Sequence, residues 1–182
     1  SEMCIRDRDG EVIKQVSQEI YSTGKVTDKS EIGTYWWNKF QKAFNSAYED
    51  SFETQRKLEY ESLKKTIEYF NSTANAKELS DLMFAHWIKP PIFEESKQFF
   101  EMCPVPIYVV SNIDRDDVLK AIEYHGLKPN GIFTSEDAKS YKPRKELFQF
   151  ALNSTGLSAE QVVHIGDSLS SDIKGASAVG IN

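Results

Sequence analysis

The second half of the chain alternates short apolar runs with segments of helical periodicity, and this alternation restricts the possible folds more than any other feature. The apolar runs are "PIYVV", "GIFTS" and "VVHIGD", and apolar positions at helical spacing follow each of them. Strands and helices that alternate with short connections form βαβ units, whose strands are parallel. Residues 91–182 are therefore predicted to form an α/β domain with a Rossmann-like parallel sheet, with one strand at each run.

The first half has a different pattern, since apolar residues recur at helical spacing from residue 11 to about residue 103. Val12, Val16 and Ile20 begin this pattern. The adjacent Pro90 and Pro91 interrupt it and indicate a boundary. We expect residues 11–90 to form an all-helical domain, a helix bundle, with the three tryptophans of the chain in its core.

Charge and composition exclude several kinds of partner. The chain has 22 basic and 28 acidic side chains and a formal net charge of −6, which disfavours binding to a nucleic-acid backbone. No apolar run reaches the roughly 20 residues that cross a bilayer, so no membrane partner is expected. Two cysteines without a CxxC spacing favour a reducing, cytoplasmic location.

Polar residues follow the predicted strands at the edge where a parallel sheet binds its ligands. Ser111 and Asn112 follow the first run, Lys142 lies in a loop before a helix, and Asp167 and Asp172 follow the last run. A hydroxyl and a fixed cation suit the oxygens of a phosphate ester, and two carboxylates suit a hard divalent metal. Together these residues predict a phosphate site beside a metal site.

Three segments in order carry a resemblance to a known family: "VVSN", "SYKPRKELFQFAL" and "VVHIGDSLSSDIKGASAVGI". They resemble the second, third and fourth motifs of the haloacid dehalogenase (HAD)-like hydrolase superfamily, and the helical segment before them is similar to the cap domain of many members. The resemblance implies a phosphatase in which an aspartate attacks phosphorus and water then hydrolyses the acyl phosphate. It also implies Mg²⁺ as the cofactor and a small phosphorylated metabolite as the substrate.

Carried onto this sequence, the family motifs imply a role for each polar residue. Ser111 and Asn112 would bind phosphoryl oxygens, Lys142 would neutralise their charge, Asp167 would ligate Mg²⁺, and Asp172 would support the metal directly or through water. The substrate stays open among sugar phosphates, phosphoglycolate and nucleoside monophosphates, with nucleotidase-like and phosphoglycolate-phosphatase-like members closest in their motifs. We expect a monomer or a homodimer.

The stretch "DRDG" at residues 7–10 stands where the family has its first motif, whose two aspartates are the nucleophile and the general acid/base. Few apolar residues precede it, Arg8 stands where an apolar residue is usual, and Glu11 brings a negative charge toward the phosphate. We therefore expect residues 1–10 to be a non-native segment, and the family's first and last strands to be missing from the chain. A working first motif at Asp7 and Asp9 is the alternative.

Two other functions are compatible with the same residues. A 2-haloacid dehalogenase also uses an aspartate nucleophile but needs no metal, and the two acids of "GDSLSSD" favour the metal-dependent branch. A non-catalytic module could hold a phosphorylated ligand through the same serine, lysine and aspartates. His164 lies within an apolar run, and we interpret it as a hydrogen-bonded residue of the predicted strand rather than as a catalyst.

Overall fold

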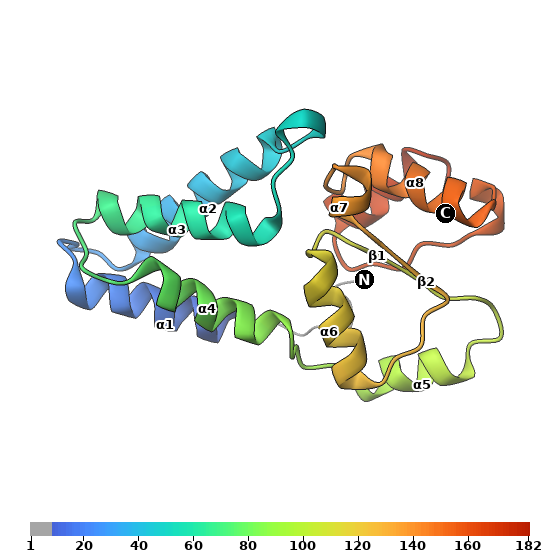
Figure 1. Cartoon of the computed structure of the whole chain (residues 1–182), viewed down its shortest axis with the longest axis horizontal. Helices are drawn as coiled ribbons and strands as arrows, with labels where there is room; N and C mark the ends of the chain where they lie inside the picture. The colour runs from blue at the N-terminus through green and yellow to red at the C-terminus, as the bar shows by residue number, and fades with distance from the viewer. Residues whose placement is uncertain (1–8) are drawn as a thin grey trace.

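Four α-helices build the first half of the chain in the computed structural model, which describes residues 9–182 (Figure 1). They are α1 (Asp9–Thr23), α2 (Ser30–Ser46), α3 (Gln55–Tyr69) and α4 (Ala76–Trp87). The side chain of Thr54 accepts a hydrogen bond from a backbone N–H in the first turn of α3, and Asn75 does the same for α4. Residues 9–87 are called the helical half below.

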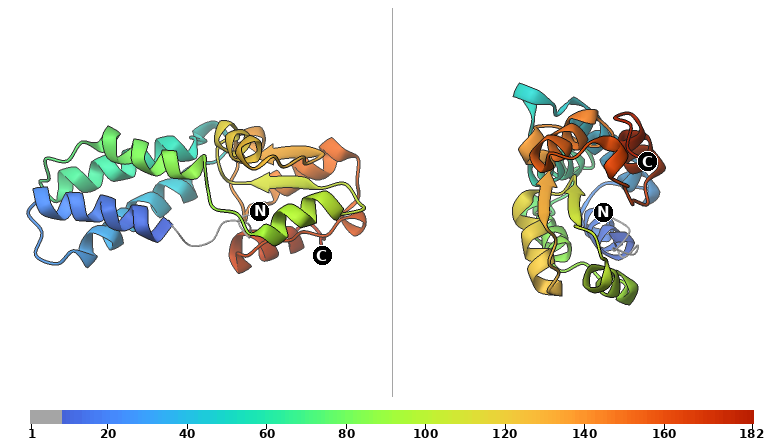
Figure 2. Two further views of the ribbon diagram at one scale, coloured as in Figure 1. Left: turned by 90° about the horizontal axis from the view of Figure 1, so that it is seen from below. Right: turned by 90° about the vertical axis from the view of Figure 1, so that its right-hand side faces the viewer.

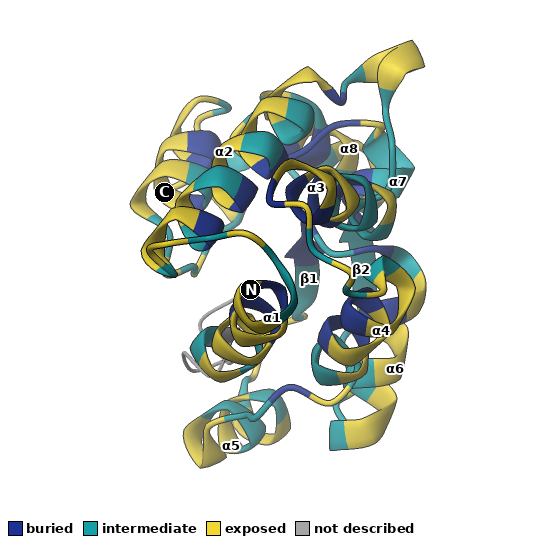
Figure 3. Cartoon of the chain, turned by 90° about the vertical axis from the view of Figure 1, so that its left-hand side faces the viewer, coloured by how far each residue is buried: buried dark blue, intermediate teal, exposed yellow. Residues whose placement is uncertain are grey.

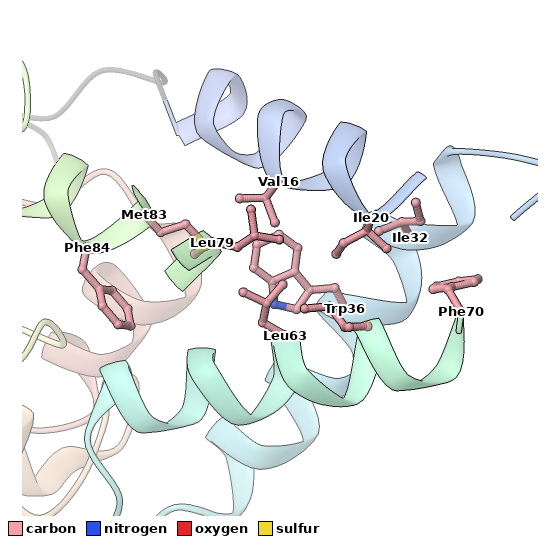
Figure 4. Packing of buried hydrophobic residues seen from close by; sticks show 10 residues of the cluster. Val16, Ile20, Ile32, Trp36, Leu63, Phe70, Leu79, Met83 and Phe84 are labelled. Atoms are coloured by element: carbon pink, nitrogen blue, oxygen red, sulfur yellow. The ribbon is translucent and has the colours of Figure 1, made fainter. Parts of the chain in front are cut away.

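The helical half has its own apolar core, because α1, α2, α3 and α4 turn their buried faces toward one another (Figures 3 and 4). Trp36 lies among these side chains, and its indole N–H donates to the Ser62 hydroxyl at 3.2 Å. The prediction that the tryptophans are core residues is confirmed for Trp36. It is wrong for Trp37, which is 57% exposed, because adjacent residues on a helix point about 100° apart.

Helices and strands alternate in the second half, and residues 94–182 are called the α/β half. Its α-helices and strands are α5 (Glu94–Met102), β1 (Tyr108–Ser111), α6 (Arg115–His125), β2 (Gly131–Thr134), α7 (Ser135–Ala138), α8 (Lys145–Thr155) and α9 (Gly175–Ser177). A 3-10 helix (Ala159–Gln161) and a short π-helix (Leu169–Lys174) lie between α8 and α9. The two strands pair in parallel, with Tyr108 opposite Gly131 and Ser111 opposite Thr134. Figure 2 shows this half beside the helical half, so the prediction of an α/β fold with a parallel sheet and a helical bundle is confirmed.

Two glycines end helices of the α/β half as left-handed caps. Gly126 follows α6 with φ 67°, and Gly156 follows α8 with φ 69°, a region that most other residues avoid. Val110 of β1 packs against Leu147 and Phe148 of α8 and forms a second apolar core, separate from that of the helical half. Within residues 9–182, none of the helices combines the length and the apolar character that crossing a membrane requires.

The prediction of a third strand at 162–167 is wrong for the described residues. This segment has no regular secondary structure. Among residues 9–182 it pairs with neither β1 nor β2, and its one backbone bond outside a turn joins the His164 N–H to the Asn182 carbonyl at 2.9 Å. Val163 and Ile165 are 74% and 47% exposed, which is unlike a strand buried on both faces. An apolar run becomes a strand only where a neighbouring strand takes up its backbone groups.

Candidate active site

The carboxyl end of β1 places Ser111 and Asn112 at the edge of the sheet, as the sequence predicts. Both side chains are buried. The Ser111 hydroxyl oxygen accepts a hydrogen bond from the backbone N–H of Ile113 at 3.1 Å, which closes the turn after the strand. Among the described residues no acceptor takes the Ser111 hydroxyl proton, so this proton is available to a ligand oxygen.

The Asn112 carboxamide joins two loops. Its oxygen accepts from the backbone N–H of Lys142 at 2.7 Å, and its nitrogen donates to the backbone carbonyl of Lys142 at 3.2 Å. This pair of bonds fixes the Lys142 loop against the end of β1. One N–H of the carboxamide is left over, because an amide nitrogen carries two. Asn112 therefore positions Lys142 and can give at most one further bond to a phosphoryl oxygen.

The Lys142 ammonium lies in the interior, with 1% of its side chain exposed. It donates to Oδ1 of Asp172 at 2.6 Å and to the backbone carbonyl of Val110 at 3.1 Å. A lysine ammonium has three donors, so one N–H remains for a ligand. A buried cation is costly unless it is paired, and the Asp172 carboxylate meets that requirement.

Asp172 is fully buried and receives three hydrogen bonds. Lys142 and Nε2 of His164, the latter at 3.0 Å, reach its Oδ1, and the backbone N–H of Ser168 reaches its Oδ2 at 3.2 Å. Burial alone would raise the pKa of this carboxyl, but the hydrogen bonds from His164 and Lys142 hold its pKa well below the usual range. Only glycine fits at position 166, because a β-carbon there would collide with the Asp172 side chain.

Asp167 has a different environment from Asp172. Its side chain is exposed, and it has no hydrogen bond or ion pair with any described residue. No cluster of three His, Cys, Asp or Glu side chains able to hold a metal is present in residues 9–182. Mg²⁺ nevertheless binds typically through one or two carboxylates, with waters and substrate phosphates completing its shell. The exposed carboxylate of Asp167 fits such a ligand.

The structure connects most of the predicted site residues. Direct bonds link Asn112 to Lys142 and Lys142 to Asp172, and Ser111 adjoins Asn112. His164 is hydrogen-bonded, as the sequence analysis expects, but the segment that carries it is not a strand among the described residues. Asp7 lies outside the described residues, and so does the side chain of Asp9.

Two contacts of this site were missed by the sequence reasoning. Asp114 and Tyr141, each within two residues of a predicted ligand, fasten the site to the helical half. No local sequence pattern predicts these contacts, because the partner of Asp114 lies 59 residues away and that of Tyr141 lies 88 residues away.

A comparison with protein families identifies the family of the chain. A family model described as haloacid dehalogenase-like hydrolase matches residues 5–182. The chain belongs to this family. The matched range includes almost the whole chain and confirms the resemblance inferred from the three motifs.

Two relatives are similar over part of the chain. YfnB of Bacillus subtilis, named as a HAD-hydrolase, is 38% identical over 79 residues, which cover 42% of this chain and 34% of YfnB. A glyceraldehyde 3-phosphate phosphatase of Methanocaldococcus jannaschii is 38% identical over 58 residues, which cover 31% of this chain and 25% of that protein. The matched stretches therefore span only about a third and a quarter of the length of these curated relatives.

Solved structures of the family share the fold. The magnesium-bound structure of YfnB superposes with a TM-score of 0.74 and 20% identity, covering 100% of this chain and 83% of YfnB. An L-2-haloacid dehalogenase of Xanthobacter autotrophicus, solved with chloropropionic acid covalently bound, gives a TM-score of 0.71 and 16% identity, covering 98% of this chain and 71% of the dehalogenase. At these identities the likeness concerns the fold alone.

Proposed function

We propose that this chain forms part of a Mg²⁺-dependent phosphatase that acts on small phosphorylated metabolites through an aspartyl-phosphate intermediate. The observation that carries the proposal is the contrast between the two acids of the last motif. Asp172 is buried and committed to Lys142, whereas Asp167 is exposed and has no partner among the described residues. Asp172 thus fixes the Lys142 ammonium, and Asp167 is available to a metal.

The anion-binding part of this proposal rests on donors that the fold leaves unused. The Ser111 hydroxyl proton and one N–H of the Lys142 ammonium have no acceptor among residues 9–182. Both groups belong to the carboxyl end of β1 or to the loop bonded to it, so they can approach the same phosphoryl group. In a buried site such charge-assisted bonds offset the negative charge of the transferring group.

Magnesium would be held by the carboxylate of Asp167, with Asp172, in the short π-helix Leu169–Lys174, as its support. A bound Mg²⁺ supplies positive charge to the phosphoryl oxygens and orients the ester for in-line attack. The name of the M. jannaschii relative, a phosphatase similar to this chain in sequence, supports this branch of the family.

The chemistry needs an aspartate nucleophile. A carboxylate oxygen attacks phosphorus, the bond from phosphorus to the ester oxygen breaks, and a general acid protonates the departing alcohol. Water then hydrolyses the acyl phosphate and releases inorganic phosphate. In this sequence Asp7 and Asp9 stand at the position of the first motif, with Arg8 and Glu11 as unfavourable neighbours. We therefore expect slow or no turnover by the 182-residue chain, and Asp7→Asn to abolish any turnover that occurs.

The test uses p-nitrophenyl phosphate and versions of the protein with and without a complete first motif. With that motif, hydrolysis should require Mg²⁺, stop with EDTA, and fall at least about 100-fold in Asp167→Asn, an effect typical of losing a preorganised electrostatic group. Asp81→Asn, an exposed carboxylate of α4, is the matched control and should be silent.

Three outcomes would contradict the phosphatase. Hydrolysis that EDTA leaves unchanged would exclude the metal role. Metal-independent release of chloride from 2-chloropropionate would indicate a dehalogenase instead. Phosphate-ester binding without turnover, in the protein with a complete first motif, would indicate the non-catalytic module.

A further inference from the structure

The two loops that carry the candidate anion-binding residues are each fastened to the helical half by a buried side chain. We propose that the helical half holds these loops in their binding geometry, with Asp114 and Tyr141 as positioning residues. This inference rests on the proposed function, because it concerns the same anion site. It adds that the site is complete only while the helical half is docked.

Asp114 makes the first connection. It is buried, follows Asn112 by two residues, and its carboxylate accepts from the backbone N–H groups of Gln55 at 2.7 Å and Arg56 at 2.9 Å. These are the first two N–H groups of α3, which have no partner within the helix. A carboxylate at a helix N-terminus also interacts favourably with the helix dipole. A residue of the α/β half therefore caps a helix of the helical half.

A salt bridge beside this cap strengthens the first connection. The Arg56 guanidinium donates to both carboxylate oxygens of Asp117 at 2.7 and 2.6 Å, and the Asp117 side chain is 1% exposed. The same guanidinium lies 4.3 Å from the ring centroid of Phe84 in α4. The start of α6 is thus fixed to both α3 and α4.

Tyr141 makes the second connection, directly before Lys142. Its hydroxyl donates to the backbone carbonyl of Glu53 at 2.7 Å. Its ring is buried and lies 4.1 Å from the ring centroid of Phe44 and 5.2 Å from that of Phe52. The residue next to the buried ammonium is therefore inserted among aromatic side chains of the helical half.

These contacts form a continuous series, called the circuit below, that begins and ends in the helical half. From the helical half it passes through Asp114 to Asn112, across the carboxamide bonds to Lys142, and through Tyr141 back to the helical half. A break at either connection leaves one loop held by fewer bonds. Binding groups act only within a narrow range of positions. A looser loop therefore binds the anion more weakly even though every anion-binding side chain is still present.

The sharpest test removes one N–H of the circuit without touching Asp114. Gln55→Pro deletes the Gln55 N–H at the first position of α3, where proline is well tolerated. The preceding Thr54 already has φ −64° and ψ 153°, which a following proline allows. Gln55→Ala is the matched control, because it removes the same side chain and keeps the N–H.

Orthophosphate binding by calorimetry and hydrogen exchange are measured on the 182-residue chain. We expect Gln55→Pro to bind phosphate about 5- to 10-fold more weakly than Gln55→Ala, the lower range of coupling between two sites. Exchange in residues 111–118 should be about 10-fold faster, as the loss of a charge-assisted bond predicts. Tyr141→Phe should act similarly on residues 139–143, with Tyr124→Phe on the exposed face of α6 as its control.

The outcomes separate the inference from the proposed function. Equal phosphate affinity and equal exchange in Gln55→Pro and Gln55→Ala, with faster exchange confined to α3, would overturn the positioning role. Absence of phosphate binding in the unmodified chain would overturn the proposed anion site, and the exchange comparison would then decide the structural connection alone. If Gln55→Pro lowers the helical circular dichroism signal, the Tyr141→Phe pair decides the inference.

Discussion

Replacing Asp172 by asparagine should reveal how strongly the α/β half depends on one buried charge. Lys142 and Asp172 are 1% and 0% exposed, and their charged atoms are 2.6 Å apart. Asparagine keeps an oxygen that can accept from the ammonium but removes the compensating charge. Breaking a buried pair on one side costs about 3–5 kcal/mol. Since a domain is stable by only about 5–15 kcal/mol, Asp172→Asn should lose a large part of the free energy of unfolding.

The assay is urea denaturation followed by far-ultraviolet circular dichroism. Tryptophan emission is unsuitable, because all three tryptophans lie at positions 36, 37 and 87, in the helical half. Lys142→Met and the double variant complete a mutant cycle. The double variant should be more stable than the sum of the single losses by about 1–3 kcal/mol, because it leaves no unpaired charge. Additive losses would refute the argument that the two side chains stabilise each other.

The same pair predicts an acid dependence. The pKa of Asp172 is lower in the folded protein than the ordinary value of about 3.9 for an unfolded chain. The ionised Asp172 carboxylate therefore contributes fully to the free energy of unfolding above that value, and this contribution is lost as the pH falls toward the lowered pKa. The stability difference between the unmodified chain and Asp172→Asn should narrow below about pH 4. A difference that stays constant from pH 7 to pH 3 would contradict this linkage.

Three further substitutions test neighbouring parts of the structure in the same denaturation assay. Gly166→Ala should cost about 1–3 kcal/mol, since the new methyl group meets the Asp172 carboxyl, and Gly33→Ala in α2, where no atom lies within 4 Å of the new methyl group, is the control that should not destabilise the chain. Arg56→Met leaves the buried carboxylate of Asp117 unpaired and should cost about 2 kcal/mol, less than a fully buried pair, because Arg56 is 37% exposed. Trp36→Phe should cost about 1–3 kcal/mol through lost packing and a lost hydrogen bond, and an unchanged midpoint would contradict its central place in the core.

Local signals in the sequence predict the elements that depend on local physics. The periodicity of α1 and α3 and the left-handed cap at Gly126 follow from patterns within a few residues. The parallel pairing of β1 with β2 follows from the alternation of strand and helix patterns along residues 108–134. The motif order also identifies the family, as the match over residues 5–182 confirms. The roles of Ser111 and Asp167 stay predictions.

Contacts between distant segments could not be predicted in this way. Asp114 is an ordinary residue before a helix in the sequence, and only docking of α3 onto it creates a buried cap. Asn112 is predicted to contact phosphate, and the structure also engages both ends of its carboxamide with Lys142, which leaves one N–H for a ligand. A single sequence shows which groups are present but not which of their hydrogen bonds the fold itself consumes.

The segment 162–172 shows how the fold and the site depend on each other. Among the described residues it pairs with neither strand, and side-chain contacts connect it to the sheet. Val162 packs on the core of the α/β half. His164 donates to Asp172, Asp172 accepts from the Lys142 ammonium, and the same ammonium donates to the carbonyl of Val110 in β1. The bonds that place Asp172 beside the candidate anion site therefore also hold this segment to the sheet. Lys142→Met, which removes the ion pair and keeps Asp172, should for this reason loosen residues 162–172 and lower both the stability and the metal affinity.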